Sequence, residues 1–299
     1  MKLPATCNAV VIQGAVLLAI LGFAPALHAQ YGGSGDQQQK QNTPPPSLKQ
    51  QDSSKSGAQQ GQQGQQATQA PVDPEEEKAY KAFSDTKSDA YDQQIQLGEQ
   101  YLQKYPNGHY AEQVYSKLTN AYFQKQQFDK MYAASDKALA INPHDVSVLV
   151  LVGWVVPHNY DPNDPEAERR LAKAEAYEKH ALELLNTMNK PDGMTDDQYA
   201  KAKQASMAQA HSGLGLIYFR QQQFDKSVAE MQEAVKLDTA PDSVDLYILG
   251  VGLSQLKRYP EAADAFQKCA AIPGAVQDRC KQREGEAKKL AAAQPAPPK

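Results

Sequence analysis

The residues that most often carry chemistry in proteins are scattered along this chain instead of grouped. The 299 residues include six histidines, and none has a second histidine or cysteine at the spacing of a metal site. Asp161, Asn163 and Asp164 resemble the start of a calcium loop, but the glycine and terminal glutamate of such a loop are missing. No glycine-rich phosphate loop or serine nucleophile motif occurs. We therefore expect no catalytic residue, metal, cofactor or small-molecule substrate, and the protein is predicted not to be an enzyme.

The composition indicates helices. Alanine, glutamine, glutamate, lysine and leucine dominate, and all of them favour helical backbone. Runs rich in β-branched residues are scarce, and the exception is the segment from Val146 to Val156. A net charge of −4 provides no basic field that would attract nucleic acid. The sequence therefore predicts an all-α protein that does not bind nucleic acid.

The N-terminus resembles a secretory signal peptide. Lys2 precedes an apolar stretch from Val10 to Phe23, and small residues suited to cleavage follow at Ala26 and Ala29. A stretch of about 14 apolar residues is short for a membrane span. We predict a signal peptide over 1–29, cleaved after one of these two alanines, and a periplasmic or secreted mature protein without a transmembrane span. An uncleaved signal that tethers the protein to the membrane is the alternative.

A long polar segment separates this leader from the rest of the chain. Residues 30–73 consist largely of Gln, Gly, Ser, Pro and Lys, with too few apolar side chains to offset the entropy of ordering. We predict a disordered linker there, a helical domain over 74–290 and a disordered tail over 291–299, which contains three prolines.

One sequence motif occurs twice within the predicted domain. The nine residues from Tyr122 to Lys130 return 96 positions later, from Tyr218 to Lys226, with seven of nine identical. Repetition of this kind indicates stacked units of secondary structure. Around both copies, large and small residues follow the spacing that packs one helix against the next. The same phase continues through the segment that begins at Leu246 and ends at Cys269.

This pattern resembles the tetratricopeptide repeat, a pair of antiparallel helices of about 34 residues. Tyr115, Leu118, Tyr122 and Ala138 fill its characteristic positions in the clearest unit. The resemblance covers most of the chain after residue 74, and bacterial envelope proteins contain similar units. It implies a right-handed superhelix of about five helix pairs that ends in a capping helix.

Two insertions depart from the family pattern. Residues 157–165 contain three prolines, and Pro157 is expected to cut short the apolar helix before it. Residues 188–197 precede a long helix, for which Thr195 and Gln198 predict a capping box. The insertions are either spacers or a surface for a partner.

The resemblance also places two cysteines close together. Cys269 occupies the small-residue position of the last unit, and Cys280 takes the first large packing position of the next helix. These surfaces touch in the family, so we predict a structural disulfide that fastens the capping helix. Two buried free thiols are the alternative.

Tetratricopeptide arrays usually bind peptides on the concave face of their first helices. Carried over to this chain, that face is mostly aromatic, amide and apolar, with a single arginine. The groove candidates are Asn120, Phe123, Gln124, Trp154, Leu216, Phe219, Arg220, Tyr247 and Val251. Aromatic residues and arginine are enriched in binding hot spots, although Trp154 and Phe219 could instead belong to the core.

The function expected from this resemblance is a protein-interaction scaffold, or adaptor, of the cell envelope. Members that bind a terminal carboxylate use a clamp of Lys, Arg and Asn, and only Asn120 matches here. The other clamp positions hold Ser212, Gly213, Val244 and Ile248, which disfavours that mode. The alternatives are a structural subunit of an envelope-assembly or secretion complex and, more weakly, a cell-wall polysaccharide-binding module.

Overall fold

The computed structural model describes residues 72–191 and 193–294, and these residues contain eleven α-helices and no strand. The helices are α2 (Pro74–Ser84), α3 (Tyr91–Lys104), α4 (Ala111–Gln124), α5 (Phe128–Ile141), α6 (Val146–His158), α7 (Ala167–Thr187), α8 (Asp196–Arg220), α9 (Phe224–Leu237), α10 (Ser243–Gln255), α11 (Tyr259–Ala270) and α12 (Gln277–Ala293). The predicted signal peptide, the predicted linker up to residue 71 and most of the predicted tail lie outside these residues. None of the described helices is long and apolar enough to cross a membrane.

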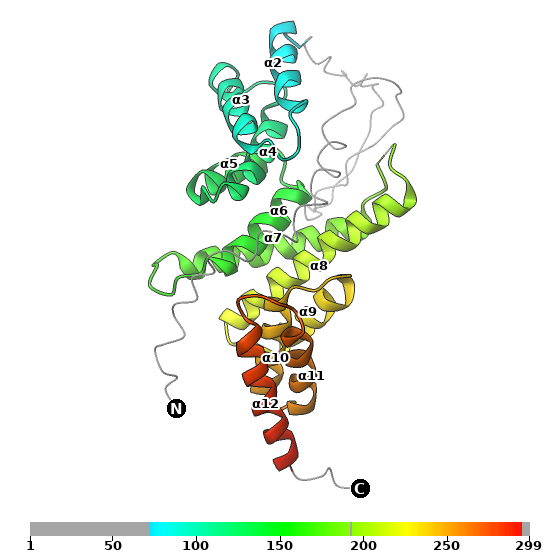
Figure 1. Ribbon diagram of the computed structural model, residues 1–299. Coiled ribbons are helices and arrows are strands. Elements are labelled where there is room, and N and C mark those ends of the chain that lie inside the picture. Colours follow the sequence, from blue (N-terminus) through cyan, green and yellow to red (C-terminus); the bar gives the residue numbers. More distant parts are fainter. Residues whose placement is uncertain (1–71, 192, 295–299) are drawn as a thin grey trace, which may run out of the picture.

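The helices pack as consecutive pairs, α2 with α3 through α10 with α11, and α12 then covers α11. First helices also contact the first helix of the next pair, so that α4 touches α6, α6 touches α8 and α8 touches α10. The stack runs from α2 at one end to α12 at the other (Figure 1). The prediction of a helical-repeat solenoid with five pairs and a final capping helix is therefore confirmed for the described residues.

Side-chain caps fix where several first helices begin. Asp145 accepts a hydrogen bond from the amide of Val148 at 3.1 Å, and Asp242 accepts one from Val244 at 2.7 Å. Thr195 and Gln198 form the predicted capping box at the start of α8. The expectation that Pro157 ends α6 is corrected by one residue, because the proline lies in the last turn and the helix continues to His158.

The duplicated motif forms the tight turn inside a helix pair. Gln126 and Gln222 occupy the same position in the two copies, and both have left-handed backbone, with φ of 56° and 60°. The next amide bonds back to the preceding helix in each turn, from Gln127 to Tyr122 and from Gln223 to Tyr218, both at 2.8 Å. This backbone geometry is unfavourable for any residue other than glycine.

Gln222→Gly is therefore expected to raise the free energy of unfolding by about 1 kcal/mol, since glycine adopts this backbone without a steric cost. The control is Gln100→Gly in the exposed middle of α3, which should lower it by about 1 kcal/mol. Urea unfolding of the three proteins measures both effects. Destabilisation by Gln222→Gly would contradict the strain argument.

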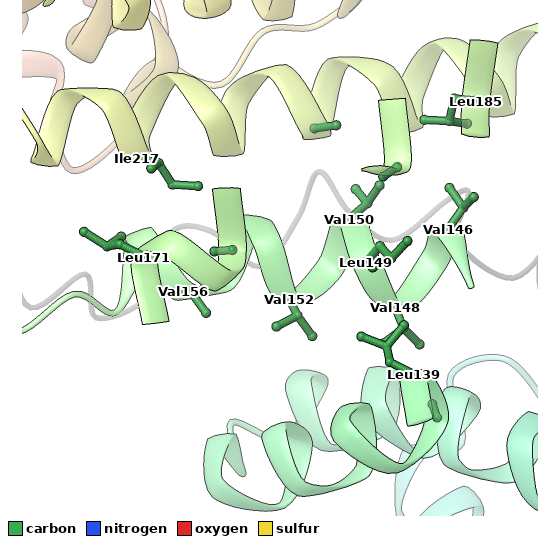
Figure 2. Close-up of a cluster of buried hydrophobic side chains, with 14 residues drawn as sticks. Leu139, Val146, Val148, Leu149, Val150, Val152, Val156, Leu171, Leu185 and Ile217 are labelled. Atoms are coloured by element: carbon green, nitrogen blue, oxygen red, sulfur yellow. The ribbon is translucent and has the colours of Figure 1, made fainter. Parts of the chain in front are cut away.

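Helix α6 lies at the centre of the fold. Of its 13 residues, 11 are buried, because it is apolar on every side. Val148, Val152 and Val156 belong to a core shared with Leu139 of α5 and Ile217 of α8, together with residues of α7 (Figure 2). Leu151, Trp154 and Val155 belong to a second core with α2, α4 and α5. Helix α6 thus joins the N-terminal pairs to the rest of the solenoid.

A glutamate is buried where α6, α7 and α8 meet. Glu178 of α7 is fully buried, and neither carboxyl oxygen has a hydrogen-bond partner among the described residues. Its side chain fills the space left by two glycines. A Cβ atom on Gly153 of α6 would lie 2.5 Å from the Glu178 Cδ, and a Cβ on Gly213 of α8 would clash with Oε1. Burial raises the pKa of Glu178 well above its usual value.

Glu178→Gln is expected to stabilise the protein at pH 8 and to have a progressively smaller effect toward pH 4. The native pKa exceeds the unfolded one, so the native state binds more protons, and stability falls as pH rises from the unfolded pKa through the native pKa. Glutamine has the same shape but no ionisable group, so the variant does not lose this stability as the pH rises. Urea unfolding at several pH values measures the free energy of unfolding of both proteins.

The control for this test is Glu175→Gln on the same helix. Glu175 accepts hydrogen bonds from Lys179 at 2.7 Å and from Tyr218 at 3.2 Å, so its removal should not stabilise the protein. A constant difference between Glu178→Gln and the wild type at every pH would contradict the ionisation argument.

The C-terminal helix is covalently attached. Cys269 of α11 and Cys280 of α12 are both fully buried and form a disulfide, with their Cα atoms 5.8 Å apart. Helix α12 continues to Ala293, so its last three residues lie within the region predicted as a disordered tail. The bridge closes a short loop and holds the capping helix against the last pair.

Candidate functional site

The predicted groove residues lie on α4, α6, α8 and α10, the first helices of four consecutive pairs. Since each of these helices contacts the next first helix, they form one continuous face of the solenoid. The structure divides the candidates into an N-terminal group around Trp154 and a C-terminal group around Tyr247. The two groups differ in polarity and in how much of each side chain is accessible.

Aromatic rings from α4 and α6 form the first part of the N-terminal group. Phe123 is half-buried and meets Trp154 edge to face, with ring centroids 6.2 Å apart. The ring of His158 lies 3.9 Å from that of Trp154, and its Nδ1 is 2.7 Å from the Trp154 carbonyl oxygen. Burial lowers the pKa of His158 to about 4, so this ring is uncharged at neutral pH.

Arg220 at the end of α8 completes this group. Its Nε donates a hydrogen bond to the Pro157 carbonyl at 3.2 Å, and its guanidinium lies 5.5 Å from the centre of the Tyr160 ring. Tyr160 is in turn held by Glu168, to which its hydroxyl donates at 2.7 Å. We call Phe123, Trp154, His158, Tyr160 and Arg220 the aromatic–arginine cluster. Tyr160 and His158 were not among the predicted groove residues, because the 157–165 insertion breaks the repeat pattern there.

The C-terminal group is apolar and more enclosed. Phe219, Tyr247 and Val251 are half-buried and pack against the core of α8 to α11. Tyr247 also lies 5.9 Å from Phe266, measured between ring centroids. Leu216 is 3% exposed and belongs to this core, and Trp154 is 9% exposed. These last two side chains therefore support the face from beneath and offer little surface of their own.

Asn120 and Gln124 complete the set on α4, where both are half-buried. The positions that correspond to a carboxylate clamp are used for internal packing instead. Ser212 is buried and donates a hydrogen bond to Asp245 of α10 at 2.8 Å, while Gly213 makes room for Glu178. The Ser212–Asp245 hydrogen bond has a counterpart earlier in the array, where the Ser116 hydroxyl of α4 donates to Asp145 at the start of α6.

The pKa of Asp245, the hydrogen-bond partner of Ser212, is shifted by its surroundings. Burial, helped by the nearby Asp242 and Asp238, raises the pKa of Asp245 to about 7, although the Ser212 hydrogen bond acts in the opposite direction. The native state therefore holds a proton on Asp245 between about pH 4 and 7, where the unfolded chain does not.

Asp245→Asn is expected to reduce the loss of stability that accompanies a rise in pH from about 4 to 7, because it removes a group that is protonated in the native state alone over that window. Thermal unfolding at pH 4.5, 5.5, 6.5 and 7.5 measures the slope. Asp264→Asn, at an exposed site on α11, is the control and should leave the slope unchanged. An unchanged slope in Asp245→Asn would contradict the assignment.

A cavity of about 210 Å³ lies away from this face, between α5, α6 and α7. Val152 and Val156 are among its lining residues, together with Arg169, Arg170 and Lys173. Each cation is paired: Lys173 Nζ lies 2.7 Å from the Asp136 carboxylate, Arg170 pairs with Asp164, and Arg169 pairs with Glu166. The cavity therefore has no surplus positive charge for an anion, and none of the predicted groove residues lines it.

Comparison with known families identifies one unit. The tetratricopeptide repeat family matches residues 208–240, which span the second half of α8, all of α9 and the start of the following loop. Residues 208–240 are a tetratricopeptide repeat. This match confirms the resemblance that the sequence pattern indicated. No curated protein matches the sequence.

Solved structures with a similar fold are tetratricopeptide-type proteins of low sequence identity. PilW, described as a widely conserved type IV pilus biogenesis factor, is 17% identical, with a TM-score of 0.50 over 74% of this chain and 90% of that chain. The protein MamA AMB-1 is 18% identical, with a TM-score of 0.46 over 68% and 95% of the two chains. A tetratricopeptide repeat protein of Thermus thermophilus is 16% identical, with a TM-score of 0.43 over 67% and 91%. At such identities the likeness concerns the fold alone.

Proposed function

We propose that the protein is a non-catalytic interaction scaffold that holds a protein segment on the face formed by its first helices. The observation that carries this proposal is the aromatic–arginine cluster, in which side chains of α4, α6 and α8 and of the 157–165 insertion meet on one side of the solenoid. The tetratricopeptide match to residues 208–240 supports it, since such repeats generally bind protein partners.

The chemistry of this cluster suits an uncharged or weakly acidic protein segment. Phe123 and Tyr160 are half-buried, so part of each ring is accessible while the rest is held in place. Arg220 is exposed, yet its Nε is already oriented by the Pro157 carbonyl. Arginine and aromatic rings that are positioned in advance lose little conformational entropy on binding, which is why they dominate interface hot spots.

We further propose that the protein acts outside the cytoplasm, in the bacterial periplasm or after secretion. The basis is the N-terminal sequence, with Lys2, the apolar stretch from Val10 to Phe23 and the small residues that follow. The Cys269–Cys280 disulfide is consistent with this, because disulfides persist in oxidising compartments. The scaffold would then serve a partner of the cell envelope.

Site-specific photocrosslinking tests the binding face. A photoreactive amino acid placed at position 220 should capture a partner in the native cell, whereas the same group at position 169 should not. Arg169 lies on α7, where 77% of its side chain is exposed, and it lines the α5–α6–α7 cavity, which contains none of the predicted groove residues. Mass spectrometry then identifies the captured protein.

With the captured partner purified, Arg220→Ala should weaken its binding by about 2 kcal/mol, or about 30-fold, the size of a hot-spot loss. Arg169→Ala should leave the affinity unchanged. Capture of the same partner from position 169 and not from position 220 would place the binding surface elsewhere and refute the proposal.

A further inference from the structure

Two histidines that are far apart in the sequence meet on the surface of the solenoid. His144 lies in the loop between α5 and α6, and His180 lies on α7, 36 residues later. The Nδ1 of His144 is 2.8 Å from the Nε2 of His180, and their ring planes are inclined by 49°. One of these nitrogens carries the hydrogen that the other accepts, so the two nitrogens face each other across a single hydrogen bond.

We propose that His144 and His180 form a binding site for a divalent transition-metal ion of the zinc type, which joins the loop before α6 to α7. Two imidazole nitrogens bound at about 2.0–2.1 Å to a tetrahedral zinc ion lie about 3.3 Å apart. The observed 2.8 Å is shorter by about 0.5 Å, so the two rings must turn apart slightly. The hydrogen between them must also move to the far nitrogen of its own ring before both facing nitrogens can bind one ion. Imidazole nitrogen is a preferred ligand of zinc, copper and nickel ions.

The Glu183 carboxylate lies near the His180 ring, on the side away from His144. When Nε2 of His180 binds a metal, the ring proton resides on Nδ1, which faces the Glu183 carboxylate at 3.7 Å. Metal-bound histidines usually donate their second ring N–H to a carboxylate or a carbonyl group, which fixes the ring and raises its basicity. Glu183 is one turn further along α7 and is placed for that role without touching the metal.

The backbone holds the two rings in position. The His144 amide donates to the Asn142 Oδ1 at 3.1 Å, and the next residue, Asp145, caps α6. His180 is next to Ala181, which is fully buried in the α6–α8 core. The site itself is open to solvent, because His144 is exposed and 34% of the His180 side chain is accessible.

The other histidines of the described residues are already engaged in different contacts. His211 pairs with Glu230 at 2.6 Å, His158 is enclosed beside Trp154, and His109 meets Tyr110 edge to face. No group of three or more His, Cys, Asp or Glu side chains in residues 72–191 and 193–294 could hold a metal ion. Two histidine nitrogens are therefore the protein ligands at this site, and water completes the shell.

Isothermal titration of the full-length protein with ZnCl₂ tests the proposal. The wild type should bind zinc at this site with a defined stoichiometry, and His144→Ala and His180→Ala should each weaken that binding at least tenfold. Glu183→Gln should weaken it by about tenfold, as expected of a supporting carboxylate. His109→Ala, at a histidine outside the pair, is the matched control and should bind as the wild type does.

Two further readouts separate metal binding from a structural role of the histidine pair. Far-UV circular dichroism establishes that each variant is folded, and zinc should raise the melting temperature of the wild type and of His109→Ala but not that of the His144→Ala/His180→Ala double variant. Zinc binding that persists in the His144→Ala/His180→Ala double variant, or the absence of saturable binding in the wild type, would overturn the proposal.

Discussion

The burial of α6 is the constraint on which the rest of the structure depends. A helix that is apolar on all sides has no stable exposed state, so other helices must cover it completely. Helices α4 and α5 cover it on one side and α7 and α8 on the other, which makes α6 a member of two cores at once. In an ordinary repeat the first helix leaves one side exposed to a groove. In this protein α6, the first helix of the central pair, has almost no exposed side.

The buried Glu178 follows from the same crowding. Helices α6 and α8 approach α7 at two glycines, and the side chain nearest to both is that of Glu178, whose carboxyl group has no hydrogen-bond partner among the described residues. A buried polar group of this kind costs stability, since it has lost its contacts with water and gained none in return. The junction at the centre of the solenoid is therefore held by apolar packing around a locally unfavourable point.

Both surfaces proposed to bind something lie at the ends of α6. The aromatic–arginine cluster surrounds its C-terminus, where Pro157 and the insertion turn the chain away from the core. The histidine pair stands at its N-terminus, beside the Asp145 cap. Because 11 of its 13 residues are buried, α6 is a suitable support for both. A metal at one end and a protein partner at the other would act on the same element.

The sequence by itself determined the periodic part of this protein. Apolar spacing and the duplicated segment were enough to predict the helix pairs, and Thr195 with Gln198 predicted the capping box, because these features depend on residues that are close along the chain. The family resemblance also brought Cys269 and Cys280 together, at the junction where the structure forms a disulfide. Only the tertiary structure decided which side chains of the first helices remain accessible, since the burial of Leu216 and Trp154 depends on neighbouring pairs. It also decided that His144 meets His180 and that Glu178 is enclosed by two glycines. Such contacts join residues that are far apart in the sequence, and their geometry is set by how the helices pack, which no local pattern encodes.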